Sequence, residues 1–385
     1  MTFDILLLVV SMVVQWRIAS LALDWIRRRL SGGKRIAARA GVVLFAAILP
    51  LGLGCSYSDL VSRLRIPGRP AMILGACTLA YLVTSAGVLL LYFVLREARR
   101  RLVPALDPGR RQALNTMGSV LMVSPFAAVG YGIVNRTDFH VREVDVPIPE
   151  LTPDLDGLRI LQLSDIHLSL FLSESELARV IDAAQGVHPH LTVVTGDLIS
   201  QSGDPLDACI RQLARLKADA GVFGCMGNHE RYARVESYTE RAAARVGIRF
   251  LRGASRQLRF GNSVLNLAGV DHQSMAGGKQ YLRGAERLVA PGACNVLLSH
   301  NPDVFPVAAR QGYNLMLSGH THGGQVTVEI LDQSINPARF FTPYVYGLYR
   351  TAEAAAYVTR GIGTIGIPAR IGAPPEIAVL RLRKA

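Results

Sequence analysis

Residue types that bind metal ions recur in the second half of the sequence, each time just after a short apolar run. Two histidines two positions apart lie in the glycine-rich stretch 319–324, as His320 and His322, and Asp165 and His167 have the same spacing. Carboxylate, amide and imidazole donors without a thiolate form a mixed oxygen and nitrogen shell, which suits divalent ions such as Mn, Fe or Zn. The pattern therefore predicts a metal site.

Five apolar runs end in such residues. The runs are 158–163 before Asp165 and His167, 191–195 before Asp197, 222–226 before Asn228 and His229, 295–299 before His300, and 315–318 before His320 and His322. Short β-branched runs that alternate with helical stretches are typical of α/β or mixed-sheet enzymes. Because side chains at the carboxyl ends of strands converge on one crevice, we expect the five endings to form a single site.

Each ending also has an ordinary structural explanation. Gly-Asp after a strand is common in turns, and a single histidine such as His300 is often a surface residue or a hydrogen-bonded core residue. The stretch 319–324 is more specific, because glycines allow close backbone approach while both imidazoles stay available. The combination of five endings in one order favours a shared metal site.

The ordered blocks Asp-x-His, Gly-Asp, Gly-Asn-His-Glu, His and Gly-His-x-His resemble those of the calcineurin-like metallophosphoesterase superfamily, in its bacterial membrane-anchored branch. The resemblance runs from about Arg159 to Leu382, and the amino end is similar to that of transmembrane proteins with a metallophosphoesterase domain. It implies an α/β (α+β) four-layer sandwich of two mixed β-sheets flanked by helices. The implied domains are a bundle of about four transmembrane helices at 1–135 and a metallophosphoesterase domain at 136–385.

The resemblance also implies a role for each matching residue. Asp165, His167 and His322 would hold one divalent metal ion, Asn228, His300 and His320 the other, Asp197 would bridge both, and His229 would contact the phosphate and protonate the leaving oxygen. Two cations about 4 Å apart lower the pKa of a shared water, so that a bridging hydroxide can attack the phosphorus in line. Three neighbours stay open: His272 either approaches the site or lies in a plain loop, and Arg231 and Tyr232 are candidates for phosphate contact.

The first third of the chain is apolar enough to enter a membrane. The stretches 40–58, 71–95 and 113–134 are each near the roughly 20 residues that a spanning helix needs. A fourth stretch, 5–23, contains Gln15 and Arg17. A cation in the middle of a membrane is costly unless it is paired or reaches the surface, so this stretch is either a span or an interfacial helix.

The net charge of +13 belongs almost entirely to this first third. Up to Phe139 the chain has 17 Lys and Arg against 6 Asp and Glu, which leaves 25 against 23 for the remainder. The basic residues gather in the first and third connections between the apolar stretches, and such connections stay in the cytoplasm. The sequence therefore predicts a multi-pass protein of the cytoplasmic (inner) membrane with its catalytic domain outside the cytoplasm.

Together these features predict a membrane-anchored, metal-dependent phosphoesterase acting on phosphomonoesters or diesters. Attachment to a membrane favours a lipid or a lipid-linked cell-envelope substrate, with membrane lipids as partners. No nucleic-acid partner is expected, because a nearly neutral domain lacks the basic surface that a phosphate backbone requires. The alternatives are a nuclease or nucleotide phosphodiesterase of the same family, and a non-catalytic binding module of a receptor or transporter, although all seven expected ligands are present.

Overall fold

The computed structural model describes residues 2–54, 68–102, 124, 127–274, 280–330 and 333–385. The chain divides into two compact units, one made of 1–133 with 366–369 and the other of 134–365 with 370–385. The first unit is helical, and the second contains all the strands that the structure describes.

Among the described residues, the helical unit contains α1 (Thr2–Arg29), α2 (Gly32–Gly54) and α4 (Gly68–Leu102) and most of a further helical segment at 127–135. Each contains a stretch long and apolar enough to cross a membrane, at Val9–Arg29, Gly32–Gly52 and Pro70–Val94. The prediction of apolar helices at 5–23 and 71–95 is confirmed. The apolar stretch expected at 40–58 lies in a helix that begins earlier, at Gly32, and its expected end at 55–58 lies outside the described residues. Most of the stretch 113–134 lies outside the described residues.

Arg17 packs against aromatic rings inside this unit. Its guanidinium carbon lies 5.2 Å from the centroid of the Trp16 ring and 5.6 Å from that of Phe93 on α4. Phe45 of α2 and Tyr81 of α4 also meet edge to face, with ring centroids 5.1 Å apart. A cation over an aromatic face keeps part of the attraction that water would otherwise provide, so Arg17 is compatible with an otherwise apolar helix.

The second unit is built from two six-stranded sheets. The first has the strand order β1 (His140–Ile148), β14 (Glu376–Lys384), β2 (Arg159–Leu163), β3 (Leu191–Val194), β4 (Val222–Gly224), β5 (Ile248–Phe250). The second has the order β12 (Gly347–Arg350), β13 (Ala355–Val358), β9 (Leu315–Ser318), β8 (Cys294–Leu298), β7 (Ser263–Gly269), β6 (Ala254–Phe260). Both are mixed: β2 to β5 pair in parallel while β14 runs antiparallel to β2, and β13, β9, β8 and β7 pair in parallel between two antiparallel edge strands.

The two sheets pack face to face because their strands alternate side chains between two apolar faces. In β2, Ile160 joins the core between the sheets, while Leu161 and Leu163 face the opposite side. From the second sheet, Leu317 and Val296 fill the same inter-sheet core.

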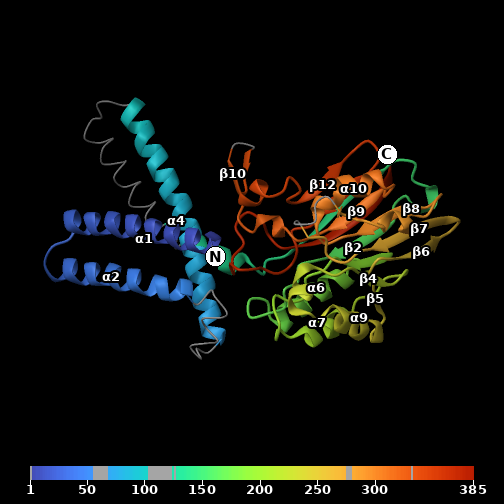
Figure 1. Ribbon diagram of the computed structural model, residues 1–385, viewed down its shortest axis with the longest axis horizontal. Coiled ribbons are helices and arrows are strands. Elements are labelled where there is room, and N and C mark those ends of the chain that lie inside the picture. The colour runs from blue at the N-terminus through green and yellow to red at the C-terminus, as the bar shows by residue number, and fades with distance from the viewer. Residues whose placement is uncertain (1, 55–67, 103–123, 125–126, 275–279, 331–332) are drawn as a thin grey trace. The chain divides into compact units, whose positions relative to one another are not determined.

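Helices cover the outer face of each sheet (Figure 1). The first sheet is covered by α6 (Glu174–Gln185), α7 (Leu206–Leu213) and α9 (Glu236–Arg245), and the second by α10 (Phe305–Arg310) and the turn η3 (Ala285–Leu288). The start of α6 is fixed by a capping box, in which Ser173 and Glu176 each accept a hydrogen bond from the other's backbone N–H. The predicted arrangement of two mixed sheets with flanking helices is confirmed.

Short elements complete the unit and lie near the strand ends. They are η1 (Pro153–Leu155), α8 (Asn228–Ala233), η4 (Pro302–Val304), η5 (His322–Gly324), η6 (Pro337–Phe340) and the hairpin of β10 (Val328–Ile330) with β11 (Gln333–Ile335). The five runs expected to be strands are β2, β3, β4, β8 and β9, which are central strands paired in parallel with a neighbour. Their carboxyl ends therefore open on one edge of the sandwich.

Candidate metal centre

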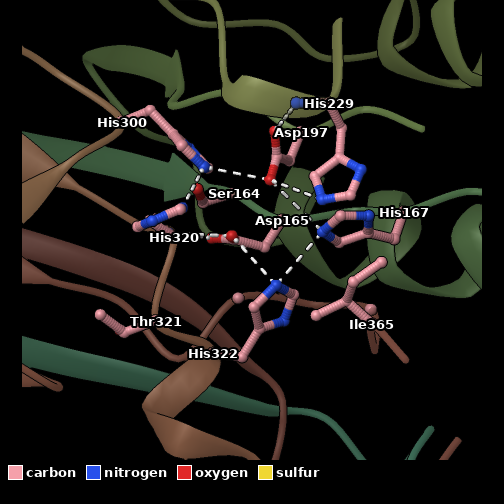
Figure 2. Close-up of polar contacts among 12 residues, drawn as sticks. Ser164, Asp165, His167, Asp197, His229, His300, His320, Thr321, His322 and Ile365 are labelled. Carbon is pink, nitrogen blue, oxygen red and sulfur yellow. Dashed lines mark hydrogen bonds and ion pairs between the residues drawn. The ribbon is translucent and has the colours of Figure 1, made fainter. Parts of the chain in front are cut away.

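The loops after these five strands bring all eight residues of the predicted site together, and Figure 2 labels all of them except Asn228. Three sets of side chains place their donor atoms within 4.8 Å of one another, and the sets share members. The sets are Asp165 with His167 and His322, His167 with Asp197 and His229, and Asp197 with His300 and His320. Asn228 joins through a contact to His300.

The first set lies between the β2 loop and the β9 loop. His167 Nε2 is 3.2 Å from His322 Nε2, which is in turn 3.4 Å from Asp165 Oδ1. Asp165 and His167 are fully buried, and His322 is 3% exposed. Three donors from chain positions 155 residues apart thus face one small volume that is closed to solvent.

The third set surrounds His300. Its Nε2 lies 3.0 Å from Asp197 Oδ2, 3.1 Å from Asn228 Oδ1 and 3.2 Å from His320 Nδ1. On the other side of the ring, Nδ1 lies 2.7 Å from the carbonyl oxygen of Thr195. A carbonyl only accepts, so Nδ1 carries the hydrogen, and in its neutral form the ring would turn an Nε2 lone pair towards two oxygens that are also acceptors.

Asp197 belongs to the second and third sets, and a single oxygen faces a histidine of each. Its Oδ2 is 3.0 Å from His300 Nε2 and 3.5 Å from His167 Nε2. The other oxygen, Oδ1, accepts a hydrogen bond of 2.9 Å from the backbone N–H of His229. This is the geometry of a carboxylate that can serve two cation sites at once.

His229 belongs to the second set, and its ring has a fixed orientation. Nδ1 lies 2.5 Å from the carbonyl oxygen of Ser200, to which it donates, so Nε2 points towards the site, 4.0 Å from Asp197 Oδ2. Ser200 also contacts His167, with Oγ 3.1 Å from Nδ1. The ring of Tyr232 packs edge to face on His229, with centroids 5.6 Å apart, and that tyrosine is 70% exposed.

The backbone at the site adopts a conformation that residues other than glycine rarely take. Five of the predicted ligands have φ in the left-handed region: Asp165 (51°), His167 (48°), Asp197 (55°), His320 (75°) and His322 (53°). Each such residue costs on the order of 1 kcal/mol and persists only where surrounding contacts hold it. Strain of this kind concentrates at functional sites, and it is what turns these side chains inward from the strand ends.

Burial and mutual charge set the protonation of the site. Burial lowers the pKa of His320 to about 3 and holds that of His322 well below the usual value, with His300 and His167 respectively adding to the effect. Burial alone would also lower the pKa of His300, but Asp197 outweighs it and raises the pKa to about 10. For Asp197, burial opposes ionisation, yet His300 and His167 hold its pKa well below normal.

These donors fit divalent cations. Neutral imidazoles and ionised carboxylates are the forms that bind metal, and the histidines whose charged form is disfavoured already have a free lone pair. In the neutral form of His300, the Nε2 lone pair, Asn228 Oδ1 and Asp197 Oδ2 converge without a donor among them, so a positive centre is needed to satisfy all three. A proton on one of these atoms satisfies only part of the set, whereas a metal cation can interact with all of its donor atoms.

Two supporting residues have no role in the sequence prediction. Glu230 is fully buried, and its carboxylate accepts from three backbone N–H groups in the loops that carry Asp197 and Asn228. Arg370 is 1% exposed and donates to the carbonyl oxygens of His322, at 3.2 Å, and Arg360, at 2.7 Å. Glu230 was visible in the Gly-Asn-His-Glu block, whereas no sequence signal pointed to Arg370.

His272, which the sequence left open, lies at the edge of the site. Its ring centroid is 5.6 Å from that of His320 and 6.0 Å from that of His300. Its Nδ1 is buried and makes no hydrogen bond with the residues that the structure describes. Burial, followed by the charge of His300, lowers the pKa of His272 to about 4.

Two facing mixed sheets whose parallel strands end in buried histidines and aspartates define a metal-dependent hydrolase. The sequence profile described as "Calcineurin-like phosphoesterase" matches residues 158–324. The chain is 31% identical to the uncharacterized metallophosphoesterase YkuE of Bacillus subtilis over 281 residues, which cover 71% of this chain and 97% of that protein. The chain therefore belongs to the calcineurin-like phosphoesterase family and is a metal-dependent phosphoester hydrolase.

Two further relatives are transmembrane proteins with a metallophosphoesterase domain. The Bos taurus protein is 29% identical over 323 residues, which cover 80% of this chain and 71% of the relative. The Danio rerio protein is 32% identical over 279 residues, which cover 69% of this chain but only 62% of the relative. Together with the three apolar helices, these relatives associate the chain with a membrane.

Proposed function

We propose that this protein is a membrane-anchored phosphoesterase with a dinuclear metal site, and that it acts on phosphoesters at the membrane surface. The observation that carries the dinuclear site is the position of Asp197 Oδ2, which faces His300 Nε2 at 3.0 Å and His167 Nε2 at 3.5 Å. Asp165 and His322 supply the other donors on the His167 side of this carboxylate.

These distances support the ligand sets that the resemblance implies. Asp165, His167 and His322 would hold one ion, Asn228, His300 and His320 would hold the other, and Asp197 would be shared. When bound, two divalent ions (Mn, Fe or Zn) would lower the pKa of an attacking water and offset the charge of the phosphate oxygens. The protein's own contribution is a dry, rigid set of donors, because six of the seven ligands are buried and the seventh, His320, is partly buried.

His229 is the proposed proton donor to the leaving oxygen. Its Nδ1 hydrogen is used on the Ser200 carbonyl, so Nε2 is the ring atom left to exchange a proton in the site. Its backbone N–H also binds Asp197 Oδ1, which fixes the distance between the ring and the shared carboxylate. A histidine placed in this way can give a proton to a departing alkoxide without contributing to metal binding.

A lipid or lipid-linked phosphoester is the proposed substrate. A helical segment at 127–135 is followed after only four residues by β1, which begins at His140. A connection this short spans at most roughly 18 Å, so β1 begins within that distance of the end of that segment. We further propose that the chain crosses the membrane several times, with the catalytic unit on the extracytoplasmic side, because the basic connections belong in the cytoplasm.

A nuclease of the same family is the weaker candidate. Nucleic-acid binding draws most of its affinity from basic residues that neutralise phosphates. The remainder of the chain after Phe139 has 25 Lys and Arg against 23 Asp and Glu, which gives no such surplus. A non-catalytic binding module is disfavoured because every proposed ligand is present.

The proposal is tested with the full chain in detergent, supplied in turn with Mn, Fe, Zn and Ni. Hydrolysis of bis-p-nitrophenyl phosphate reports phosphodiesterase activity, and p-nitrophenyl phosphate reports phosphomonoesterase activity. A phospholipid in mixed micelles is then compared with these soluble esters. The variant Asp197→Asn is the matched inactive control. Absence of hydrolysis with every metal would refute the enzymatic proposal, and equal rates on soluble and lipid esters would refute the lipid preference.

A further inference from the structure

Two neighbouring phenylalanines on the catalytic unit are almost fully exposed. Phe340 is 88% exposed and Phe341 is 76% exposed, at the end of η6. Large apolar side chains scattered singly on a surface need no explanation, but two consecutive, largely exposed ones at the end of a short turn place more apolar area at one point of the surface than a single residue does. We call this pair the aromatic tip.

The residues that flank the aromatic tip are hydrogen-bonded to the loop that carries two proposed metal ligands. Asn336 Nδ2 donates to the carbonyl oxygen of Gly323 at 2.8 Å, while Asn336 Oδ1 caps η6 by accepting from the backbone N–H of Ala338 at 2.9 Å. On the far side of the tip, Thr321 Oγ1 lies 2.5 Å from the carbonyl oxygen of Val345, to which it donates. The segment from Asn336 to Val345, which contains the tip, is therefore hydrogen-bonded at both ends to the 320–324 loop.

The base of the segment is packed, in contrast to the tip. Tyr344 meets Phe305 of α10 edge to face, with centroids 5.8 Å apart, and Tyr349 at 5.1 Å. Tyr349 Oη accepts from the backbone N–H of Val345 at 2.8 Å. The tip is thus held outward by a rigid base, and its exposure follows from the fold of the whole segment.

The composition of the segment matches a membrane surface. Between Gln333 and Ala352 the sequence has five Phe or Tyr, two Arg and no Asp or Glu. Arg339, next to the tip, is exposed. Aromatic rings are favoured at the boundary between head groups and acyl chains, and a cation beside them is attracted to anionic lipids.

We propose that the aromatic tip inserts into the surface of the membrane in which the helices of the same chain lie. The bilayer is the chosen occupant because α1, α2 and α4 are apolar enough to enter it, and because only residues 136–139 separate a helical segment from β1. Insertion beside the 320–324 loop would present the metal site to phosphoesters of that surface. This consequence rests on the proposed function, whereas the insertion does not.

Insertion is tested by placing an environment-sensitive fluorophore on Phe340→Cys in the full chain. The protein is reconstituted in nanodiscs of phosphatidylcholine and phosphatidylglycerol, with and without lipids that carry a quencher on the acyl chain. Val246→Cys is the matched control, because Val246 is 42% exposed at the end of α9. The parent chain, labelled in the same way, gives the background of the native cysteines.

We expect a blue-shifted emission that the lipid quencher suppresses at position 340 but not at position 246. Equal quenching at both positions would overturn the proposal. So would a blue shift that the lipid quencher leaves unchanged, because it would indicate that a protein surface, such as a second copy of this chain, covers the tip.

The functional consequence is tested with Phe340→Ser combined with Phe341→Ser. Hydrolysis of a phospholipid in vesicles is expected to fall by about tenfold, with hydrolysis of bis-p-nitrophenyl phosphate unchanged, because two apolar side chains no longer enter the bilayer. Phe340→Leu with Phe341→Leu keeps the apolar surface and is expected to retain activity on vesicles. Equal losses on both substrates would contradict the consequence. If the parent chain hydrolyses neither ester, the proposed function fails, and the quenching measurement still decides insertion.

Discussion

The buried carboxylate of Glu230 accepts a hydrogen bond from the backbone of Asp197. Glu230 therefore holds in place the loop of Asp197, whose own carboxylate is shared by both proposed metal positions. Glu230 Oε2 accepts from the Asp197 N–H at 3.0 Å and from the Gly227 N–H at 2.8 Å, and Oε1 accepts from the Leu198 N–H at 2.6 Å. Two loops that follow neighbouring strands are thereby joined at one side chain. Burial, followed by the charge of Asp197, raises the pKa of Glu230.

Glu230→Gln is expected to destabilise the catalytic unit. The amide would turn a donor towards a backbone N–H, and an unpaired buried group costs about 2 kcal/mol, which lowers the melting temperature by about 4–8 °C for a unit of this size. Glu143→Gln is the matched control, because Glu143 is 54% exposed in its ion pair with Arg159 and surface pairs contribute little. Thermal unfolding of the full chain in detergent measures both, and equal shifts would contradict a special role for Glu230.

The position of the site along the chain could be predicted from the sequence, because each ligand comes just after a strand that can be recognised in the sequence. Runs such as 315–318 are short, apolar and followed by a glycine, and their parallel pairing places their ends on one edge. Leu191–Val194 illustrates the same rule in the other sheet. For such residues, position along the chain was enough to indicate proximity in space.

The contacts that hold the ligands in place could not be predicted. Left-handed backbone at Asp165 or His320 is imposed by surrounding loops, and local sequence preference would disfavour it. Arg370 reaches His322 across 48 positions of the chain, and nothing in its neighbourhood marks it as buried. The exposure of Phe340 and Phe341 likewise depends on how η6 is anchored, which their apolar type alone does not reveal.

Gly361→Ala is expected to damage the metal site more than the fold. Gly361 has φ of +68°, and a Cβ built on it would lie 2.6 Å from Asp165 Cβ, so the new methyl group would displace a proposed ligand. Gly292→Ala separates this effect from backbone strain, because Gly292 has φ of +74° and nothing within 4 Å of the added atom. Strain alone costs on the order of 1 kcal/mol in both variants.

Metal content by elemental analysis and hydrolysis of bis-p-nitrophenyl phosphate are the measurements for this pair. Gly361→Ala should lose most of both, while Gly292→Ala should keep both and melt only slightly earlier. Similar metal content and activity in the two variants would show that Asp165 tolerates the displacement.

His229→Ala is expected to reduce turnover by about 100-fold or more without removing metal, because the ring is placed to donate a proton and not to bind an ion. The loss should be larger for a phosphoester with an alkoxide leaving group than for one releasing p-nitrophenolate, which departs without protonation. Steady-state kinetics on both ester types, with elemental analysis of the same samples, provide the comparison. Loss of both ions, or equal losses on the two esters, would refute proton donation by His229.

Metal stoichiometry distinguishes a shared carboxylate from two independent sites. Asp197 Oδ2 faces His300 and His167, so Asp197→Ala should weaken both proposed ions, whereas His322→Ala removes a ligand from one of them. About two ions per chain are expected in the parent protein, about one in His322→Ala and fewer than one in Asp197→Ala. Because an ion that binds only the folded state stabilises it, removal of metal with a chelator should also lower the melting temperature of the parent chain, and this shift should be nearly absent in Asp197→Ala. An Asp197→Ala protein that retains one tightly bound ion would show that the two positions are filled independently.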